Sequence, residues 1–214
     1  MKTSEVLTRT AVAAIGIPLA VVLIIHGGWP LTLTIALIAV MVTWELFLLG
    51  RAAGWEAFRW VGVAGSGAWV ILAGSMGTFP DSAPWAQGVL MAVFIVASTL
   101  AVFRRWPEGR PLSAVSLTVL GVILGGGTLS FALLIRHLPL SFPGAPPWGL
   151  SQGFLFLAFP LTITWAGDTA AYFGGSLFGK RKLIPQVSPK KTVVGSVAGF
   201  LVSALLGAWF GWFF

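Results

Sequence analysis

Long apolar runs separated by short polar segments dominate the chain. A bilayer core about 30 Å thick is crossed by a helix of around 20 apolar residues, and seven runs approach that length. Their approximate cores are residues 10–26, 31–49, 60–78, 85–103, 112–135, 149–167 and 192–214. None shows the ten-residue alternation of apolar and polar positions that is typical of a membrane β-barrel. The pattern therefore predicts one all-α domain over 1–214, a polytopic bundle of about seven transmembrane helices.

Composition supports a membrane protein. Hydrophobic residues make up 57% of the chain and charged residues only 9%, whereas a soluble domain carries roughly 25% charged residues. The mean hydropathy is +0.93. These values exclude a cytosolic globular enzyme and most nucleic-acid binders, so no nucleic-acid partner is expected. The chain has no cysteine, which excludes disulfides, thiolate nucleophiles and cysteine zinc sites.

The Lys and Arg residues predict the orientation in the membrane. The net charge is +7, and of the 13 Lys and Arg only Arg136 falls on the side opposite the N-terminus. Cytoplasmic loops carry an excess of these residues. We therefore expect a cytoplasmic N-terminus and a cytoplasmic basic segment at 180–191. The protein would be a multi-pass protein of the cell's inner (plasma) membrane, with its active site facing the cytoplasm.

The last apolar run carries a small residue at every fourth position, namely Gly195, Gly199, Ser203, Gly207 and Gly211. Such a strip lets two helix backbones approach closely in lipid. It predicts tight packing of this helix against another helix. The partner helix could belong to the same chain or to a second subunit, so a homodimer through this face is one of the two expectations.

Two acidic residues lie in or at the end of apolar runs. Ionisable groups in membrane helices cost about 2.5–3.5 kcal/mol on insertion scales and indicate a functional site by default. For Glu45, structural pairing with Arg51 or another arginine is an equal alternative. For Asp168, at the cytoplasmic end of the sixth run, function is favoured. The other acidic residues lie in termini or loops and are interpreted as solvated surface charges: Glu5, Glu56, Asp81 and Glu108.

The segment that follows Asp168 combines an acidic group, glycines and cations. Asp168 and Tyr172 are spaced to share one helix face, and Gly174, Gly175 and Gly179 are expected to let the chain turn. Five cations follow, at Lys180, Arg181, Lys182, Lys190 and Lys191. A carboxylate able to hold Mg²⁺, together with lysines and the N-terminus of the last helix, suits polyphosphate chemistry. On charge alone, an ordinary positive-inside loop that orients the protein or touches anionic lipid headgroups is the favoured interpretation.

The order of three motifs decides between these interpretations. DTAAYFG occupies 168–174, LFGK occupies 177–180, and SPKKT occupies 188–192 with Gly195 following. This block closely resembles the phosphatidate cytidylyltransferase (CDP-diacylglycerol synthase) family. The resemblance implies transfer of a cytidylyl group from CTP to phosphatidic acid at the cytoplasmic membrane face. The products would be CDP-diacylglycerol and pyrophosphate, and Mg²⁺ would be the cofactor.

The resemblance also implies roles for individual residues. Asp168, Lys190 and Lys191 are expected to be catalytic, with Asp168 as the metal ligand. Glu45 matches an acidic residue near the end of an early span in the family. The residues expected to contact substrates are Lys180, Arg181, Lys182, Ser188, Thr192, Tyr172 and Glu45.

Two features depart from the family pattern. Val194 stands where the family has Glu, and the sequence ends at Phe214, before the family's C-terminal segment with its metal-holding aspartates. We therefore expect Asp168 to be an incomplete metal site, in a fragment, a truncated chain or an inactive relative. The competing hypothesis is a non-catalytic membrane scaffold or transporter-like module whose basic loop docks anionic lipid. Binding of CTP would distinguish the two.

Overall fold

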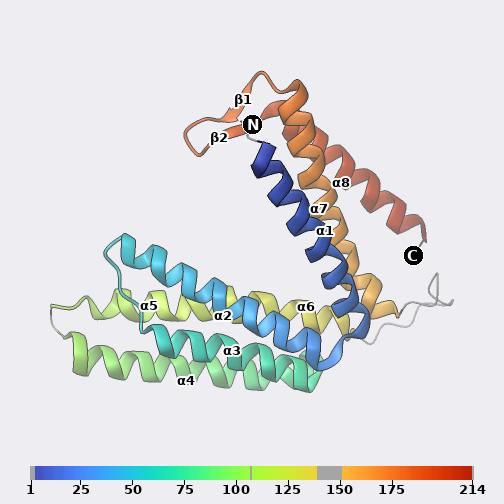
Figure 1. The fold of residues 1–214 in the computed structure, drawn as a ribbon. Helices are drawn as coiled ribbons and strands as arrows, with labels where there is room; N and C mark the ends of the chain where they lie inside the picture. The colour runs from blue at the N-terminus through green and yellow to red at the C-terminus, as the bar shows by residue number, and fades with distance from the viewer. Residues whose placement is uncertain (1–2, 107, 139–150, 214) are drawn as a thin grey trace. The chain divides into compact units, whose positions relative to one another are not determined.

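The computed structural model describes residues 3–106, 108–138 and 151–213, and the side chains within them from residue 14 to residue 212. The described chain is almost entirely helical (Figure 1), which confirms the all-α prediction. The helices are α1 (Thr3–His26), α2 (Gly28–Ala52), α3 (Arg59–Met76), α4 (Phe79–Arg105), α5 (Pro111–Val122), a π-helical segment η1 (Ile123–Gly127), α6 (Thr128–Arg136), α7 (Gln152–Phe178) and α8 (Val193–Phe213). Two short strands, β1 (Lys182–Ile184) and β2 (Ser188–Thr192), lie between α7 and α8.

Five of the described helical segments are long and apolar enough to cross a membrane: α2, α4, the continuous α5–η1–α6 helix, α7 and α8. The chain is thus a multi-pass membrane protein. The described apolar part of α1, Ala14–His26, is shorter, and α3 has 18 residues. The sixth predicted run begins at residue 149, outside the described residues, and each of the seven runs contains a helix.

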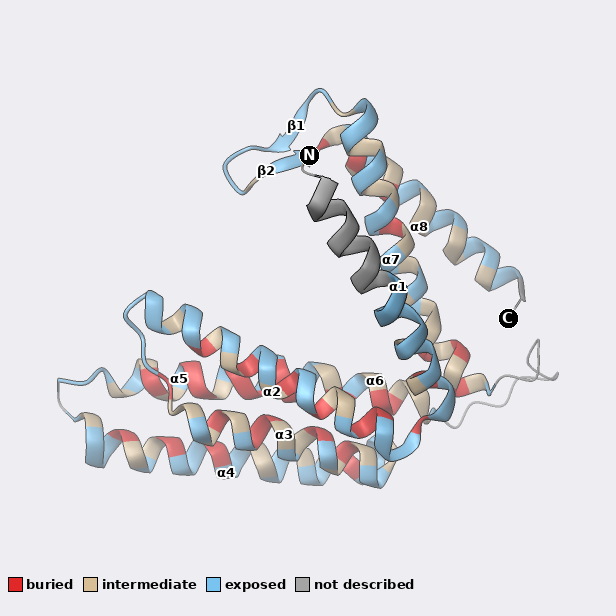
Figure 2. Cartoon of the chain, in the orientation of Figure 1, coloured by how far each residue is buried: buried red, intermediate tan, exposed pale blue. Residues whose placement is uncertain are grey.

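The chain divides into two compact units, Met1–Leu140 and Ser141–Phe214. In the first unit α2, α3, α4 and the α5–η1–α6 helix pack side by side, and Figure 2 shows buried residues along all four. Phe47 on α2 is 1% exposed. A Cβ atom at Gly62 of α3 or Gly121 of α5 would come within 2.6 Å of the Phe47 ring. The two glycines therefore let three helices close around one aromatic side chain.

Buried hydroxyl groups tie the same helices together. The Thr43 hydroxyl lies 2.9 Å from the Ser66 hydroxyl and 3.1 Å from the carbonyl oxygen of Gly121. Ser66 in turn donates to the carbonyl oxygen of Ala39 over 3.4 Å. Interhelical hydrogen bonds of this kind contribute about 0.6 kcal/mol each on average in membrane proteins. The π-helical turn sits against this network, because a Cβ atom at Gly126 would lie 2.8 Å from the Ser66 carbonyl oxygen.

Arg136 is the lone cation of the predicted outer side, and its contacts give it a structural function. Its guanidinium group donates to the carbonyl oxygens of Ile24 over 3.0 Å and Ile25 over 3.3 Å. These carbonyls belong to the last turn of α1, whose final carbonyl groups have no partners within the helix. A cation is also favourable at the negative end of a helix dipole. Arg136 therefore caps α1.

We expect Gly121→Leu to destabilise the first unit, because the new side chain must displace the Phe47 ring. Overpacking of this kind costs roughly 1–3 kcal/mol. Gly88→Leu is the matched control, since Gly88 is an exposed helical residue of α4 where an added Cβ atom would have no neighbour within 4 Å. Thermal unfolding in detergent should show a lower midpoint for Gly121→Leu alone. Equal midpoints would contradict the packing argument.

The second unit is an antiparallel pair of helices, α7 and α8, joined by the β1–β2 hairpin (Figure 1). The small-residue strip of α8 packs against α7, which confirms the predicted helix contact and places it within the chain. A Cβ atom at Gly199 would lie 2.9 Å from the carbonyl oxygen of Gly167. The Ser203 hydroxyl donates to the carbonyl oxygen of Ile163 over 3.4 Å. By contrast, a Cβ atom at Gly211 would have no neighbour within 4 Å.

This packing bears on the predicted homodimer. α7 occupies the strip from Gly195 to Ser203, so a second subunit could not use the whole strip without moving α7. Contact loosens at Gly207, where a Cβ atom would lie 3.9 Å from Ile163. A homodimer that uses the end of the strip at Gly207 and Gly211 stays a prediction.

α7 continues past the apolar run to Phe178, so Asp168 lies inside the helix, as its expected helical spacing with Tyr172 requires. The expectation of a turn is wrong for two of the glycines that follow. Gly174 and Gly175 are helical and do not form a turn. They allow close packing, because a Cβ atom at Gly174 would lie 2.8 Å from the Cβ atom of Ala198. Contact with α8 therefore extends α7 beyond its most apolar part.

Candidate functional site

The start of α8 is anchored by Thr192, the last residue of β2. Its side chain is 5% exposed, and its Oγ1 accepts a hydrogen bond from the Gly195 amide over 3.2 Å. This is the geometry of a helix N-cap, which commonly stabilises a helix by about 1 kcal/mol. A Cβ atom at Gly175 would lie 2.9 Å from the same oxygen. Thr192 thus fixes the hairpin to α7 and α8, which gives this predicted substrate-binding residue a structural function.

The N-terminus of α8 is less available to an anion than the sequence indicates. The Val193 amide donates to the carbonyl oxygen of Arg181 over 3.0 Å, which extends the hairpin. The Gly195 amide is taken by Thr192. Two of the first three amides of α8 therefore have partners within the chain. A ligand anion at this end of the unit would be held mainly by side chains.

The hairpin and the two residues that lead into it, Lys180 and Arg181, carry all five cations of the predicted site. β1 pairs with β2 in antiparallel register, with Lys182 opposite Thr192 and Ile184 opposite Ser188. The register shifts between these pairs, so the three residues 189–191 stand opposite Leu183 alone. An irregularity of this kind bends a strand and redirects its side chains. It places Lys190 and Lys191 on the bulged part of β2, and both are exposed.

No carboxylate neutralises these cations within the described residues. Lys180, Arg181 and Lys182 are exposed like the two lysines of β2. The one ion pair found in the described part of the chain joins Arg105 to Glu56, in the first unit. Between Asp168 and the last residue of the sequence there is no further acidic residue. The hairpin is therefore a concentrated positive charge that attracts polyanions.

Asp168 lies on the middle of α7 with its side chain exposed. Tyr172 follows one turn later and is also exposed, so the predicted shared face is confirmed. Gly175, which contacts Thr192, lies seven residues beyond Asp168, or about 10 Å along a helix axis. A ligand that contacts both the hairpin cations and a metal ion held by Asp168 must therefore be elongated.

The side chains of the predicted site suit a metal ion whose coordination is completed by a bound phosphate ligand. Among the described residues there is no group of three or more His, Asp and Glu side chains that could form a complete cage. Mg²⁺ usually binds through one or two carboxylates together with substrate phosphates and waters. Asp168, an exposed carboxylate on the helix to which the cationic hairpin is fixed, suits that arrangement.

Glu45 is an exposed residue of α2 and belongs to the first unit. All the other predicted site residues belong to the second unit. The alternative that Glu45 pairs with Arg51 or another arginine is wrong within the described residues, because the one ion pair found there joins Arg105 to Glu56. Glu56 is thus more than a solvated charge. Asp81 likewise lies in the first turn of α4, where it accepts a hydrogen bond from the Thr78 hydroxyl over 2.5 Å.

Comparison with known proteins gives consistent results. Residues 7–214 match the model of the cytidylyltransferase family. A phosphatidate cytidylyltransferase of Synechocystis sp. is 30% identical over 220 residues, covering 94% of this chain and 72% of the relative. The enzyme of the same name from Brucella suis is 29% identical over 187 residues, covering 67% of this chain and 69% of the relative. A third, from Chlamydia pneumoniae, is 33% identical over 132 residues, covering 62% of this chain and 40% of the relative.

Proposed function

The chain belongs to the cytidylyltransferase family, and on that premise we propose that its cationic hairpin and Asp168 form the nucleotide site for cytidylyl transfer to phosphatidate. It is a membrane nucleotidyltransferase that uses CTP and phosphatidic acid to make CDP-diacylglycerol in phospholipid biosynthesis. The observation that carries the proposed site is the hairpin itself. It presents five exposed cations, and a buried N-cap fixes it to α7 and α8.

The hairpin cations would bind the triphosphate of CTP. Lys190 and Lys191 project from the bulged strand, and Lys180, Arg181 and Lys182 precede and enter the opposite strand. Lysine acts on phosphate as a point charge, whereas arginine can donate two parallel hydrogen bonds. Because Asp168 lies about 10 Å from the level of Thr192 along α7, the nucleotide would extend along that helix. Tyr172, one turn beyond Asp168 on α7, and Ser188, the first residue of β2, would be further contacts.

Positioning of the substrates and neutralisation of their charges would provide the rate enhancement. A phosphate oxygen of phosphatidate attacks the α-phosphorus of CTP, a new P–O bond forms, and the bond to the β-phosphate breaks to release pyrophosphate. The attacking phosphomonoester is already anionic near neutral pH, so no strong general base is required. In phosphoryl transfer of this kind, orientation and electrostatic stabilisation do most of the work. Mg²⁺, when held by Asp168 and the phosphates, supplies further neutralisation of the phosphate oxygens.

The composition of the hairpin also suits a position at the membrane surface. Its apolar side chains Leu183, Ile184 and Val187 are exposed alongside the cations. A segment with apolar residues beside Lys and Arg is suited to the boundary between headgroups and acyl chains. Phosphatidate could then reach the site laterally with its acyl chains still in lipid. The excess of Lys and Arg on this side supports a cytoplasmic active site in the inner membrane.

The test is a comparison of nucleotides with the purified full chain in vesicles of phosphatidylcholine and phosphatidate. We expect radiolabel from CTP to enter lipid only when Mg²⁺ and phosphatidate are both present. We also expect CTP with Mg²⁺ to raise the thermal unfolding midpoint more than ATP does, because ligand binding stabilises the folded state. A scaffold that only docks anionic lipid would show neither effect. That result would contradict both the activity and the proposed site.

A further inference from the structure

A second cationic site lies in the first unit, at the end where α2 and α4 finish and α3 begins. It is a cavity of about 140 Å³, lined by Phe47, Arg51, Glu56, Ala57, Arg59 and Arg105. We call it the arginine pocket. Three guanidinium groups and one carboxylate share it, so the lining has an excess of two positive charges. Phe47 and Ala57, which are buried, provide an apolar floor.

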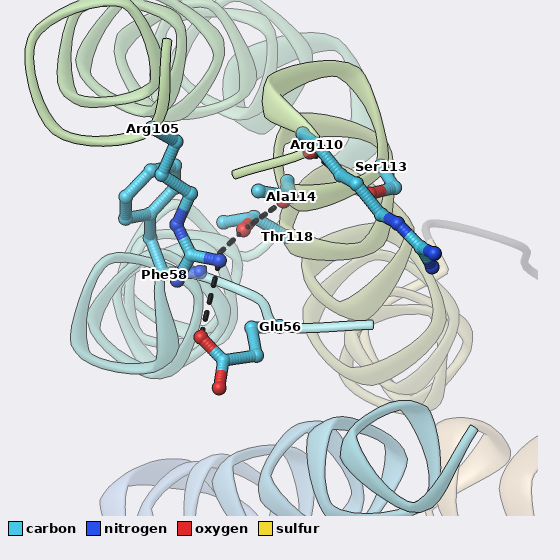
Figure 3. A network of polar contacts seen from close by, with 7 residues as sticks. All are labelled: Glu56, Phe58, Arg105, Arg110, Ser113, Ala114 and Thr118. Atoms are coloured by element: carbon cyan, nitrogen blue, oxygen red, sulfur yellow. Dashed lines mark hydrogen bonds and ion pairs between the residues drawn. The ribbon is translucent and has the colours of Figure 1, made fainter. Parts of the chain in front are cut away.

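Aromatic and acidic neighbours hold two of these arginines in place. The Arg105 guanidinium lies 5.0 Å from the centroid of the Phe58 ring and 3.2 Å from a carboxylate oxygen of Glu56. Figure 3 shows Arg105 between these two partners, whereas Arg110 extends in another direction. The Arg59 guanidinium lies 5.2 Å from the centroid of a Trp44 ring. Such cation–π contacts restrict long side chains that would otherwise be mobile. The pocket is therefore partly formed before a ligand arrives.

The three arginines share one depth in the bundle. Arg51 lies in the last turn of α2, Arg59 is the first residue of α3, and Arg105 is the last residue of α4. Because α2 and α4 are long enough to cross a membrane, their ends lie at the level of lipid headgroups. Basic pockets between membrane helices at this level bind anionic headgroups.

We propose that the arginine pocket binds the phosphate of an anionic phospholipid. A cavity of about 140 Å³ has room for a phosphate group. Arginine recognises phosphate through paired, charge-assisted hydrogen bonds. This site includes none of the residues assigned to cytidylyl transfer, so the proposal does not rest on that function.

Glu56 would compete with the bound phosphate for Arg105. Its side chain is 59% exposed and that of Arg105 is 21% exposed, and an ion pair whose carboxylate faces solvent contributes about 1 kcal/mol. A phosphate can therefore displace the carboxylate at small cost. Removal of the Glu56 charge should strengthen lipid binding, whereas removal of an arginine charge should weaken it.

The experiment measures lipid retained by the full chain after exchange from vesicles of phosphatidylcholine containing phosphatidate or phosphatidylglycerol. We expect the Arg51→Gln, Arg59→Gln double variant to retain both anionic lipids at least about fivefold more weakly. Arg104→Gln is the control, because Arg104 is an exposed residue beside Arg105 that does not line the pocket. Glu56→Gln should retain more lipid than the unaltered chain. Equal losses in the double variant and the control, or no gain in Glu56→Gln, would overturn the proposal.

Two further measurements are made. One distinguishes a lipid phosphate from free inorganic phosphate as the ligand, and the other distinguishes lipid binding in the pocket from cytidylyl transfer. Inorganic phosphate alone should raise the unfolding midpoint less than anionic lipid does, and an equal arginine-dependent rise would overturn the lipid assignment. CTP incorporation is recorded for every variant. A chain that retains anionic lipid through these arginines but incorporates no CTP would support the pocket and contradict cytidylyl transfer. The opposite result would contradict the pocket alone.

Discussion

Asp168→Asn is expected to abolish Mg²⁺-dependent incorporation of CTP into lipid, with a loss of at least about a hundredfold. Removal of one electrostatic contact to a transition state costs about this much in well-studied enzymes. Asp168 is the one acidic residue of the second unit, so no neighbouring carboxylate in that unit can replace it. Asparagine keeps the size of the side chain but loses the charge that attracts a metal ion. Rates should be measured over a range of Mg²⁺ concentrations with saturating CTP.

The matched control is Glu108→Gln, which removes the same charge from an exposed position outside the proposed site. We expect this variant to keep its activity and both proteins to keep the unfolding midpoint of the unaltered chain. Lys191→Ala should also lose activity, and it should bind CTP more weakly in the absence of metal, whereas Asp168→Asn should not. Unaltered turnover in Asp168→Asn and Lys191→Ala would remove both residues from the mechanism.

The helices were predictable because lipid imposes one strong requirement on them. A spanning segment must be apolar over about 20 residues, and that signal survives without knowledge of the packing. The boundary of α7 was not predictable in the same way. Apolarity weakens at Asp168, yet the helix continues to Phe178. Its last turns are held by contact of Gly174 with Ala198 of α8, and such tertiary contacts override local composition.

The motif order proposed Asp168 and the five cations as the site, and that assignment stays a prediction for the variants above. The hairpin that carries the cations was not predicted, because short exposed strands carry no periodic signal. The capping contact of Thr192 with Gly195 was also not predicted, although a Thr directly before the first residue of a helix is a common N-cap. The arginine pocket has no sequence signal beyond the excess of Arg in loops. Convergence of Arg51, Arg59 and Arg105 depends on the packing of three helices.

Close packing of α7 against α8 predicts that a bulky residue between these helices has a large effect on stability and activity. Gly199→Leu should separate these helices, because a Cβ atom there would lie 2.9 Å from the Gly167 carbonyl oxygen and 3.0 Å from the Ala171 Cβ atom. Neither is the end of a flexible side chain, so the helices themselves must move. Overpacking against fixed neighbours costs roughly 1–3 kcal/mol or more. The contact of Thr192 with α7 depends on the same approach, so the hairpin should shift as well.

We therefore expect Gly199→Leu to lower both the unfolding midpoint in detergent and the incorporation of CTP, the latter at least about tenfold because misplaced binding groups are costly in catalysis. Gly211→Leu tests the same substitution on the same strip of α8, at a position with no atom within 4 Å of the new Cβ. It should leave both measurements unaltered. If the two variants behave alike, contact between α7 and α8 does not position the hairpin. Loss of activity in Gly199→Leu with an unaltered midpoint would instead show that the site depends on the helix register more than the fold does.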